Sequence, residues 1–88
     1  MPWEVKLSKS ASRALDKLPR GMWPRMERAI NDLARDPIKG DVLPLHGAEW
    51  KGCFRKRVGD HRIIFTQDHD AKVVTILAVL RRSEKTYR

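Results

Sequence analysis

The sequence contains a single cysteine and no apolar run of membrane-spanning length. Cys53 alone cannot form an internal disulfide, and a lone thiol is typical of a protein kept in a reducing cytoplasm. No stretch approaches the roughly 20 apolar residues of a transmembrane helix, and residues 1–6 lack the apolar segment of a signal peptide. These absences predict a cytoplasmic protein without a membrane partner.

Residue patterns typical of metal or cofactor chemistry are also missing. His46, His61, His69 and Cys53 show neither C-x-x-C nor H-x-x-x-H spacing. Serine-nucleophile and phosphate-loop motifs are absent, and no acidic pair is placed to hold magnesium. We therefore predict no metal site and no cofactor.

Acidic residues are few relative to basic ones. Nineteen lysines and arginines against 11 acidic residues give a formal net charge of +8. Such a chain favours an anionic partner, with nucleic acid ahead of an acidic protein and a membrane surface last. The length of 88 residues and the 41% hydrophobic content predict one small folded domain over residues 1–88.

Residues 50–65 form the most informative stretch, because they read as two strands joined by Gly59-Asp60. Glycine at the first turn position favours a type II′ hairpin. Directly opposed residues share a face and side chains alternate along each strand. The turn thus predicts five pairs: Val58 with His61, Arg57 with Arg62, Lys56 with Ile63, Arg55 with Ile64 and Phe54 with Phe65. One face becomes apolar, with Phe54, Val58, Ile63 and Phe65.

The opposite face of this hairpin gathers Arg55, Arg57 and Arg62. Like charges directly opposite each other on a sheet are destabilising. Such a cluster is explained if a phosphate or carboxylate lies among the guanidinium groups. The alternative is a solvated basic face. A register slip of one residue would instead turn the arginines toward the core.

The rest of the chain predicts an α+β fold of order β-α-α-β-β-β. Residues 2–7 alternate as a strand, and Ser8 or Ser10 can cap a helix that Pro19-Arg20-Gly21 ends. A second helix begins near Met22 and ends at Asp36-Pro37. Residues 37–49 are expected to form a loop with Leu43 and Leu45 beneath it, and residues 72–80 a central strand. We expect a helical hairpin packed on a mainly antiparallel, four-stranded twisted sheet.

Metal-free cleavage of RNA is the chemistry that these residues could support. The RNA 2′-hydroxyl can attack the adjacent phosphate if a base removes its proton, an acid protonates the leaving oxygen and cations stabilise the phosphorane. Arg55, Arg57, Arg62 and Arg82 could supply the charge. Tyr87, set among the basic C-terminal residues, could act as the base. His61 is a rival base with a more suitable intrinsic pKa.

Several segments together resemble the RelE/ParE toxin superfamily. They are Leu45-His46-Gly47, the run from Phe54 to Phe65 with its Arg-x-Arg-Val-Gly-Asp-x-Arg core, Val79-Leu80-Arg81-Arg82 and Tyr87-Arg88. The resemblance spans essentially the whole chain. It implies a toxin of a type II toxin–antitoxin pair, and its RelE-like branch cleaves mRNA in the ribosomal A site without metal.

The resemblance also implies residue roles and partners. Arg55, Arg57, Arg62, Arg82 and Tyr87 match the catalytic positions. A second group is expected to contact RNA: Lys51, Lys56, His61, Arg81, Lys85 and Arg88. Expected partners are the ribosome, mRNA and a cognate antitoxin, with a monomeric free toxin and a hetero-oligomer in the complex.

Three departures from the family pattern leave alternatives open. Leu80 replaces the usual glycine, so Arg81 competes with Arg82 for the catalytic assignment. His61 replaces the usual aromatic residue. The sequence stops just after Tyr87, so a C-terminal helix found in relatives is expected to be absent. A ParE-like inhibitor of DNA gyrase and an inactive member that binds RNA or an antitoxin are the alternative functions.

Overall fold

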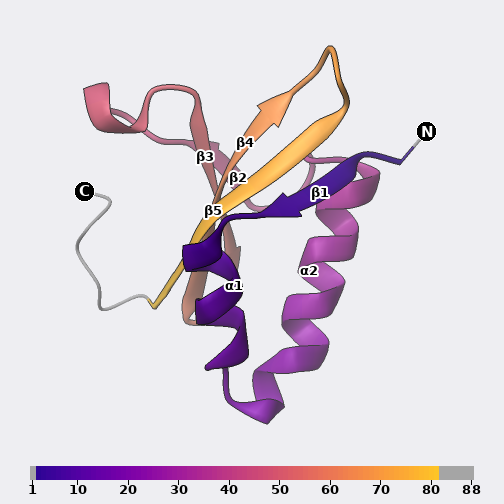
Figure 1. Ribbon diagram of the computed structural model, residues 1–88, viewed down its shortest axis with the longest axis vertical. Helices are drawn as coiled ribbons and strands as arrows, with labels where there is room; N and C mark the ends of the chain where they lie inside the picture. Colours follow the sequence, from indigo (N-terminus) through magenta and orange to yellow (C-terminus); the bar gives the residue numbers. More distant parts are fainter. Residues whose placement is uncertain (1, 82–88) are drawn as a thin grey trace.

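The computed structural model describes residues 2–81 (Figure 1). The catalytic candidates Arg82 and Tyr87 and the RNA-contact candidates Lys85 and Arg88 therefore lie outside the described residues. The elements in chain order are β1 (Glu4–Leu7), α1 (Lys9–Asp16), the 3-10 helix η1 (Arg20–Met22), α2 (Trp23–Arg35), β2 (Val42–Pro44), the 3-10 helix η2 (Ala48–Trp50), β3 (Cys53–Val58), β4 (His61–Asp68) and β5 (Val73–Arg81).

The strands form one sheet in the order β1-β5-β4-β3-β2. β1 runs parallel to β5, and the other neighbours are antiparallel. The α+β class and the mainly antiparallel sheet are confirmed, but the expected strand count of four was wrong. Residues 37–49 contain the short edge strand β2, whose Val42 pairs with Lys56. Three residues ending in a proline give too weak an alternating pattern to predict a strand.

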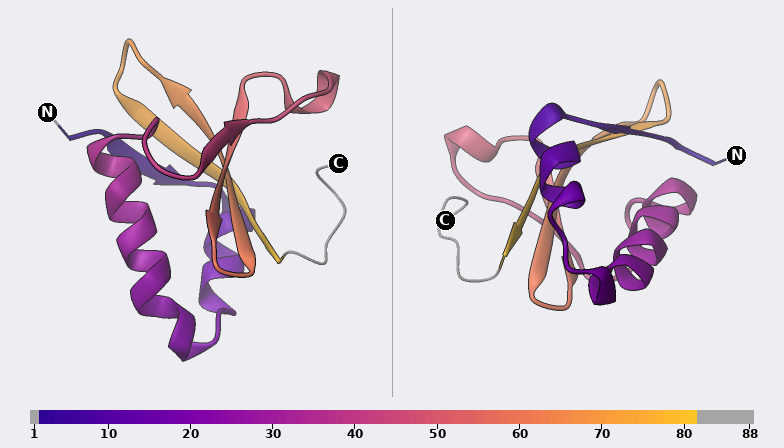
Figure 2. Two further views of the ribbon diagram at one scale, coloured as in Figure 1. Left: turned by 180° about the vertical axis from the view of Figure 1, so that it is seen from behind. Right: turned by 60° about the horizontal axis from the view of Figure 1, so that its bottom comes forward.

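Both helices cover the same face of the sheet and join at η1 (Figures 1 and 2). Of the two expected caps, Ser8 begins α1: its Oγ accepts a hydrogen bond from the Ala11 amide at 3.0 Å and donates one to the Leu77 carbonyl at 2.7 Å. One hydroxyl thus caps the helix and ties it to β5. Pro24 lies in the first turn of α2, where its missing N–H costs nothing. Within residues 2–81, no helix is long and apolar enough to cross a membrane.

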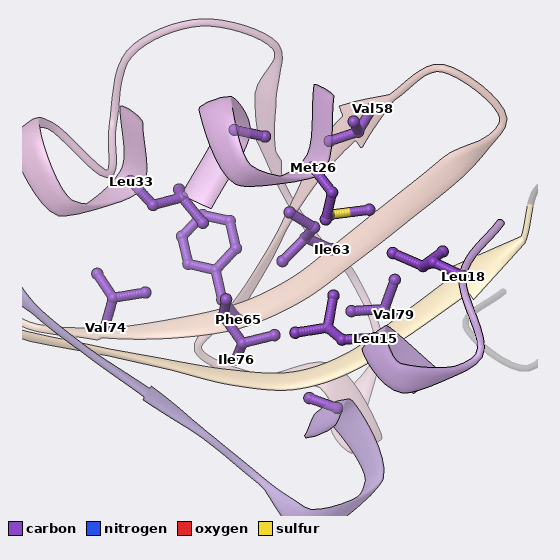
Figure 3. Close-up of a cluster of buried hydrophobic side chains, with 12 residues drawn as sticks. Leu15, Leu18, Met26, Leu33, Val58, Ile63, Phe65, Val74, Ile76 and Val79 are labelled. Carbon is purple, nitrogen blue, oxygen red and sulfur yellow. The ribbon is translucent and has the colours of Figure 1, made fainter. Parts of the chain in front are cut away.

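The hydrophobic core lies between this helical layer and the sheet (Figure 3). Met26 and Leu33 from α2 pack toward Ile63 and Phe65 from β4, and all four side chains are fully buried. The expected apolar hairpin face is therefore confirmed, although Phe54 is only partly buried. The expectation for Leu43 was wrong, because it is 51% exposed. Leu43 belongs to edge strand β2 and pairs with Arg55, so it lies on the face opposite the core.

The β3–β4 hairpin has the predicted register in all five pairs. Gly59 has φ +59°, while Asp60 is not among the residues with positive φ. This sign pattern is that of a type II′ turn. The guanidinium of Arg25, from α2, lies against Gly59, so a Cβ added there would come within 3.0 Å of Arg25 Nη1. The positive φ of Gly59 therefore defines the turn, and the Arg25 side chain from the helical layer covers it.

Replacing Gly59 by alanine is expected to destabilise the protein by about 1–2 kcal/mol, because an L-residue in a left-handed conformation is strained. Gly21→Ala is the matched control, since nothing lies within 4 Å of its added Cβ and its φ is not positive. We expect Gly21→Ala to stay within about 0.5 kcal/mol of the parent. Urea unfolding of both variants measures the difference, and equal midpoints would contradict the turn assignment.

Candidate functional site

The candidate site lies on the face of the sheet opposite the helices. Along β3, Phe54 and Val58 face the core, so the alternating residues Arg55 and Arg57 face the other way. Across β4, Ile63 and Phe65 are core residues, and Arg62 therefore shares the face of the two β3 arginines. The register thus brings all three predicted arginines to one face, as the sequence indicated.

A carboxylate lies between the two arginines of β3. Asp41 Oδ1 accepts a hydrogen bond from Arg55 Nη1 at 3.3 Å, and Asp41 Oδ2 lies 3.6 Å from Arg57 Nε. The Arg55 side chain is 13% exposed and that of Arg57 is 52% exposed. Asp41 therefore reduces the repulsion between two guanidinium groups that share one strand face. Sequence reasoning missed this residue because it placed Asp41 in a loop.

Arg62 is bound differently from its two neighbours. Its Nη1 donates to the carbonyl oxygens of His61 at 3.1 Å and Gly59 at 3.5 Å. Arg62 is only 5% exposed. These bonds hold its guanidinium against the hairpin turn, so Arg55 and Arg57 are the arginines of this face that also share a carboxylate. Chemically, two neighbouring guanidinium groups can bind an oxyanion through several N–H donors at once.

Two of the predicted RNA-contact residues, Lys51 and Lys56, lie in different surroundings. Lys51 is exposed and follows η2, two residues before β3 begins. Lys56 is 7% exposed and shares the helix-side face with its opposite residue Ile63. Its Nζ lies under the loop at Gly40, in a cavity of about 380 Å³ that Asp32 and Asp36 also line. The structure therefore does not bring Lys56 to the arginine face.

His61 and Arg81, also predicted to contact RNA, lie opposite each other on β4 and β5. Both line a cavity of about 530 Å³ that reaches under the end of α1, where Leu18 and Met22 form part of its wall. His61 is 7% exposed and shares its face with Val58, a core residue. The rival base and one of the two rival arginines are thus together on the helix side of the sheet, away from Arg55 and Arg57.

Within residues 2–81 no group of three or more histidine, cysteine or acidic side chains is placed to hold a metal ion. Cys53 is buried and has a free thiol. On the arginine face, guanidinium groups supply the N–H donors for an oxyanion, and Asp41 occupies some of these donors.

Comparison with known proteins gives concordant results. Residues 5–86 match the family described as the ParE toxin of type II toxin-antitoxin systems, parDE. A curated relative, toxin RelG of Mycobacterium tuberculosis, is 35% identical over 85 residues, which cover 96% of this chain and 95% of RelG.

Solved structures of toxin–antitoxin complexes are similar to this fold as well. The RelBE2 complex from Mycobacterium tuberculosis matches with a TM-score of 0.79 and 34% identity, covering 93% of this chain and 100% of the matched chain. The archaeal RelE–RelB complex from Pyrococcus horikoshii matches with a TM-score of 0.78 and 31% identity, covering 97% and 100%. The isolated RelE toxin of E. coli, at 13% identity and a TM-score of 0.77, shares the fold. With the family match spanning nearly the whole sequence, the chain belongs to the ParE toxin family of type II toxin–antitoxin systems and has a RelE-like structure.

Proposed function

We propose that this toxin is a ribosome-dependent, metal-independent endoribonuclease that cuts mRNA in the ribosomal A site and so inhibits translation. The observation that carries the proposal is the pair Arg55 and Arg57, whose guanidinium groups share one carboxylate on the face opposite the helices. Similarity to toxins named RelG and RelE supports the RelE-like branch of the family.

The proposed reaction uses the RNA's own 2′-hydroxyl as the nucleophile. The 2′-oxygen forms a bond to the adjacent phosphorus, the bond from phosphorus to the 5′-oxygen breaks, and a 2′,3′-cyclic phosphate is left. A base takes the 2′-hydroxyl proton, and an acid protonates the leaving 5′-oxygen. Arg55 and Arg57 stabilise the negative charge that builds on the phosphorane oxygens. Arg62, held beside them by the turn carbonyls, adds positive charge to the same face.

The base and the fourth catalytic arginine are proposed from the family resemblance and from the positions of the two rival residues, His61 and Arg81. His61 and Arg81 line the helix-side cavity, away from the arginine face. We therefore favour Tyr87 over His61 as the base and Arg82 over Arg81 as the catalytic arginine. Lys51, Lys85 and Arg88 remain the proposed contacts to the RNA backbone.

An antitoxin is the proposed protein partner, in a hetero-oligomer formed by a toxin that is monomeric when free. The solved relatives from Pyrococcus horikoshii and Mycobacterium tuberculosis are complexes of a toxin with its antitoxin. A net charge of +8 suits an acidic segment as the inhibitor. Such a complex would form in the cytoplasm, where ribosomes and mRNA are present.

The test is induced expression without an antitoxin, followed by primer extension on a reporter mRNA. The proposal expects growth arrest with in-frame cuts inside translated codons, and no cuts when translation of the reporter is blocked. Tyr87→Phe should remove the cuts if Tyr87 is the base, whereas retained cuts in that variant would return the assignment to His61. A second candidate, inhibition of DNA gyrase, is favoured by the ParE description of the matched family. Arrest with intact message and DNA-damage signalling would select it, and no arrest would indicate an inactive member.

A further inference from the structure

The position of Asp41 points to a role in the site beyond charge neutralisation. Its two carboxylate oxygens contact two different arginines of the same strand face, Oδ1 with Arg55 Nη1 at 3.3 Å and Oδ2 with Arg57 Nε at 3.6 Å. A phosphate oxygen of RNA would seek the same N–H donors, because carboxylate and phosphate both accept bonds from the guanidinium fork. The chain itself thus supplies an anion to the arginine cluster, the carboxylate of Asp41.

The backbone fixes Asp41 at this place. Its carbonyl oxygen accepts a hydrogen bond from the Arg57 amide at 3.2 Å, which extends the β2–β3 pairing by one residue. Directly before it, the Gly40 carbonyl accepts a bond from the Val42 amide at 2.8 Å, and Gly40 has φ +86°. The tight turn over residues 40–42, with Asp41 at its centre, and the backbone bond between Arg57 and Asp41 therefore present the carboxylate to β3.

The side chain of Asp41 remains accessible in this position. It is 49% exposed. Asp32 on α2, which lies 3.9 Å from Arg35 in a separate aspartate–arginine pair, is exposed to the same extent. The contact between Asp41 and Arg57 joins two side chains that are each about half exposed, and exposed ion pairs of this kind contribute at most about 1 kcal/mol. A phosphate that reaches Arg55 and Arg57 can therefore displace the Asp41 carboxylate. It must first replace the contacts that the carboxylate makes with the two arginines, and it is repelled by the negative charge of Asp41.

We propose that the Asp41 carboxylate is an internal placeholder for the RNA phosphate. It pairs with Arg55 and Arg57 in the free toxin, and the phosphate displaces it when RNA binds. The placeholder keeps two like charges together before the substrate arrives. It also lowers the affinity of the free toxin for RNA. This inference rests on the proposed function in that RNA is taken as the ligand.

The test compares Asp41→Asn with Asp32→Asn in RNA binding. Both variants remove one negative charge from a half-exposed aspartate paired with arginine, but only Asp41 contacts the candidate site. The probe is a fluorescent, 2′-O-methylated single-stranded RNA of about twelve nucleotides, a length within the range of single-strand sites. Anisotropy titrations over a series of salt concentrations give the affinity and its salt dependence.

The Asp41→Asn variant is expected to bind the probe about fivefold more tightly near 0.1 M salt. The slope of log affinity against log salt concentration should become more negative by about 0.7, as for one additional phosphate contact on a single strand. Asp32→Asn should change both quantities less than half as much. Equal changes in the two variants would overturn the placeholder role, and so would weaker binding by Asp41→Asn. Melting temperatures of both variants close to that of the parent verify that the fold is retained.

Cleavage on programmed ribosomes separates this inference from the proposed function. With the nuclease active, Asp41→Asn should lower KM about fivefold relative to Asp32→Asn, with kcat changed less than twofold, because the carboxylate competes for binding. If no form of the protein cuts RNA while the anisotropy difference persists, the nuclease proposal fails and the placeholder stands. If cutting is normal and the two variants are indistinguishable in both assays, the placeholder role of Asp41 fails and the nuclease proposal stands.

Discussion

Replacing Arg57 by alanine is expected to slow cleavage of ribosome-bound mRNA by roughly a hundred- to a thousandfold. Removing one preorganised donor to a developing oxyanion typically has this effect, about 2.7–4 kcal/mol in the activation free energy. Arg57 is the clearest of the three arginines to test, since its side chain is 52% exposed and its removal leaves no buried group without a partner. Single-turnover cutting of a reporter mRNA on purified ribosomes measures the rate.

Two further variants make the Arg57 result specific. Arg35→Ala removes another exposed arginine with an aspartate partner, but from α2, and should cut at a rate within about twofold of the parent. Arg57→Lys keeps the charge but loses the planar fork, so its rate should lie between those of the parent and Arg57→Ala. A normal rate for Arg57→Ala, or an equal loss for Arg35→Ala, would remove Arg57 from the proposed mechanism. Arg62→Ala is less informative, because Arg62 is 5% exposed and bonded to the turn carbonyls, so folding and catalysis would change together.

The hairpin was predictable from sequence because local rules determine it. A two-residue turn with glycine first fixes which residues oppose each other, and strand alternation then assigns the faces. Nothing beyond residues 50–65 was needed to bring Arg55, Arg57 and Arg62 together, and the structure has that register. The buried stripes of α1 and α2 were predictable for a similar reason, since helical spacing alone places Leu15 and Met26 toward the core.

The contacts of the site could not be predicted in the same way, because they join segments distant in sequence. Asp41 precedes Arg55 by 14 positions and meets it through the pairing of β2 with β3. The arrangement around Lys56 is also non-local: alternation indicates its face, but only the loop at Gly40 and the end of α2 explain how a lysine there is accommodated. For His61, the cavity beneath α1 depends on how the helical layer lies across the end of the hairpin.

Replacing Phe65 by alanine is expected to cost about 3–5 kcal/mol of folding free energy, the largest stability effect of any variant considered for this chain. Phe65 is fully buried in β4, where its ring lies beneath α2 near Leu33 (Figure 3). Its loss removes the apolar contacts of the ring and leaves a cavity that rigid neighbours cannot fill. A domain of this size has a total stability of roughly 4–13 kcal/mol. The variant should therefore unfold at a much lower urea concentration than the parent.

Phe54→Ala is the control for this effect, because Phe54 is the same residue type at the directly paired position on β3. Its ring stacks on that of Phe65 at 5.9 Å between centroids, but it is only partly buried. We expect Phe54→Ala to cost about 1–2 kcal/mol, in proportion to the smaller area that it buries. Urea unfolding followed by circular dichroism gives both values, provided that the m-values agree. Equal costs would contradict the deeper burial of Phe65 beneath α2 as the cause of its larger effect.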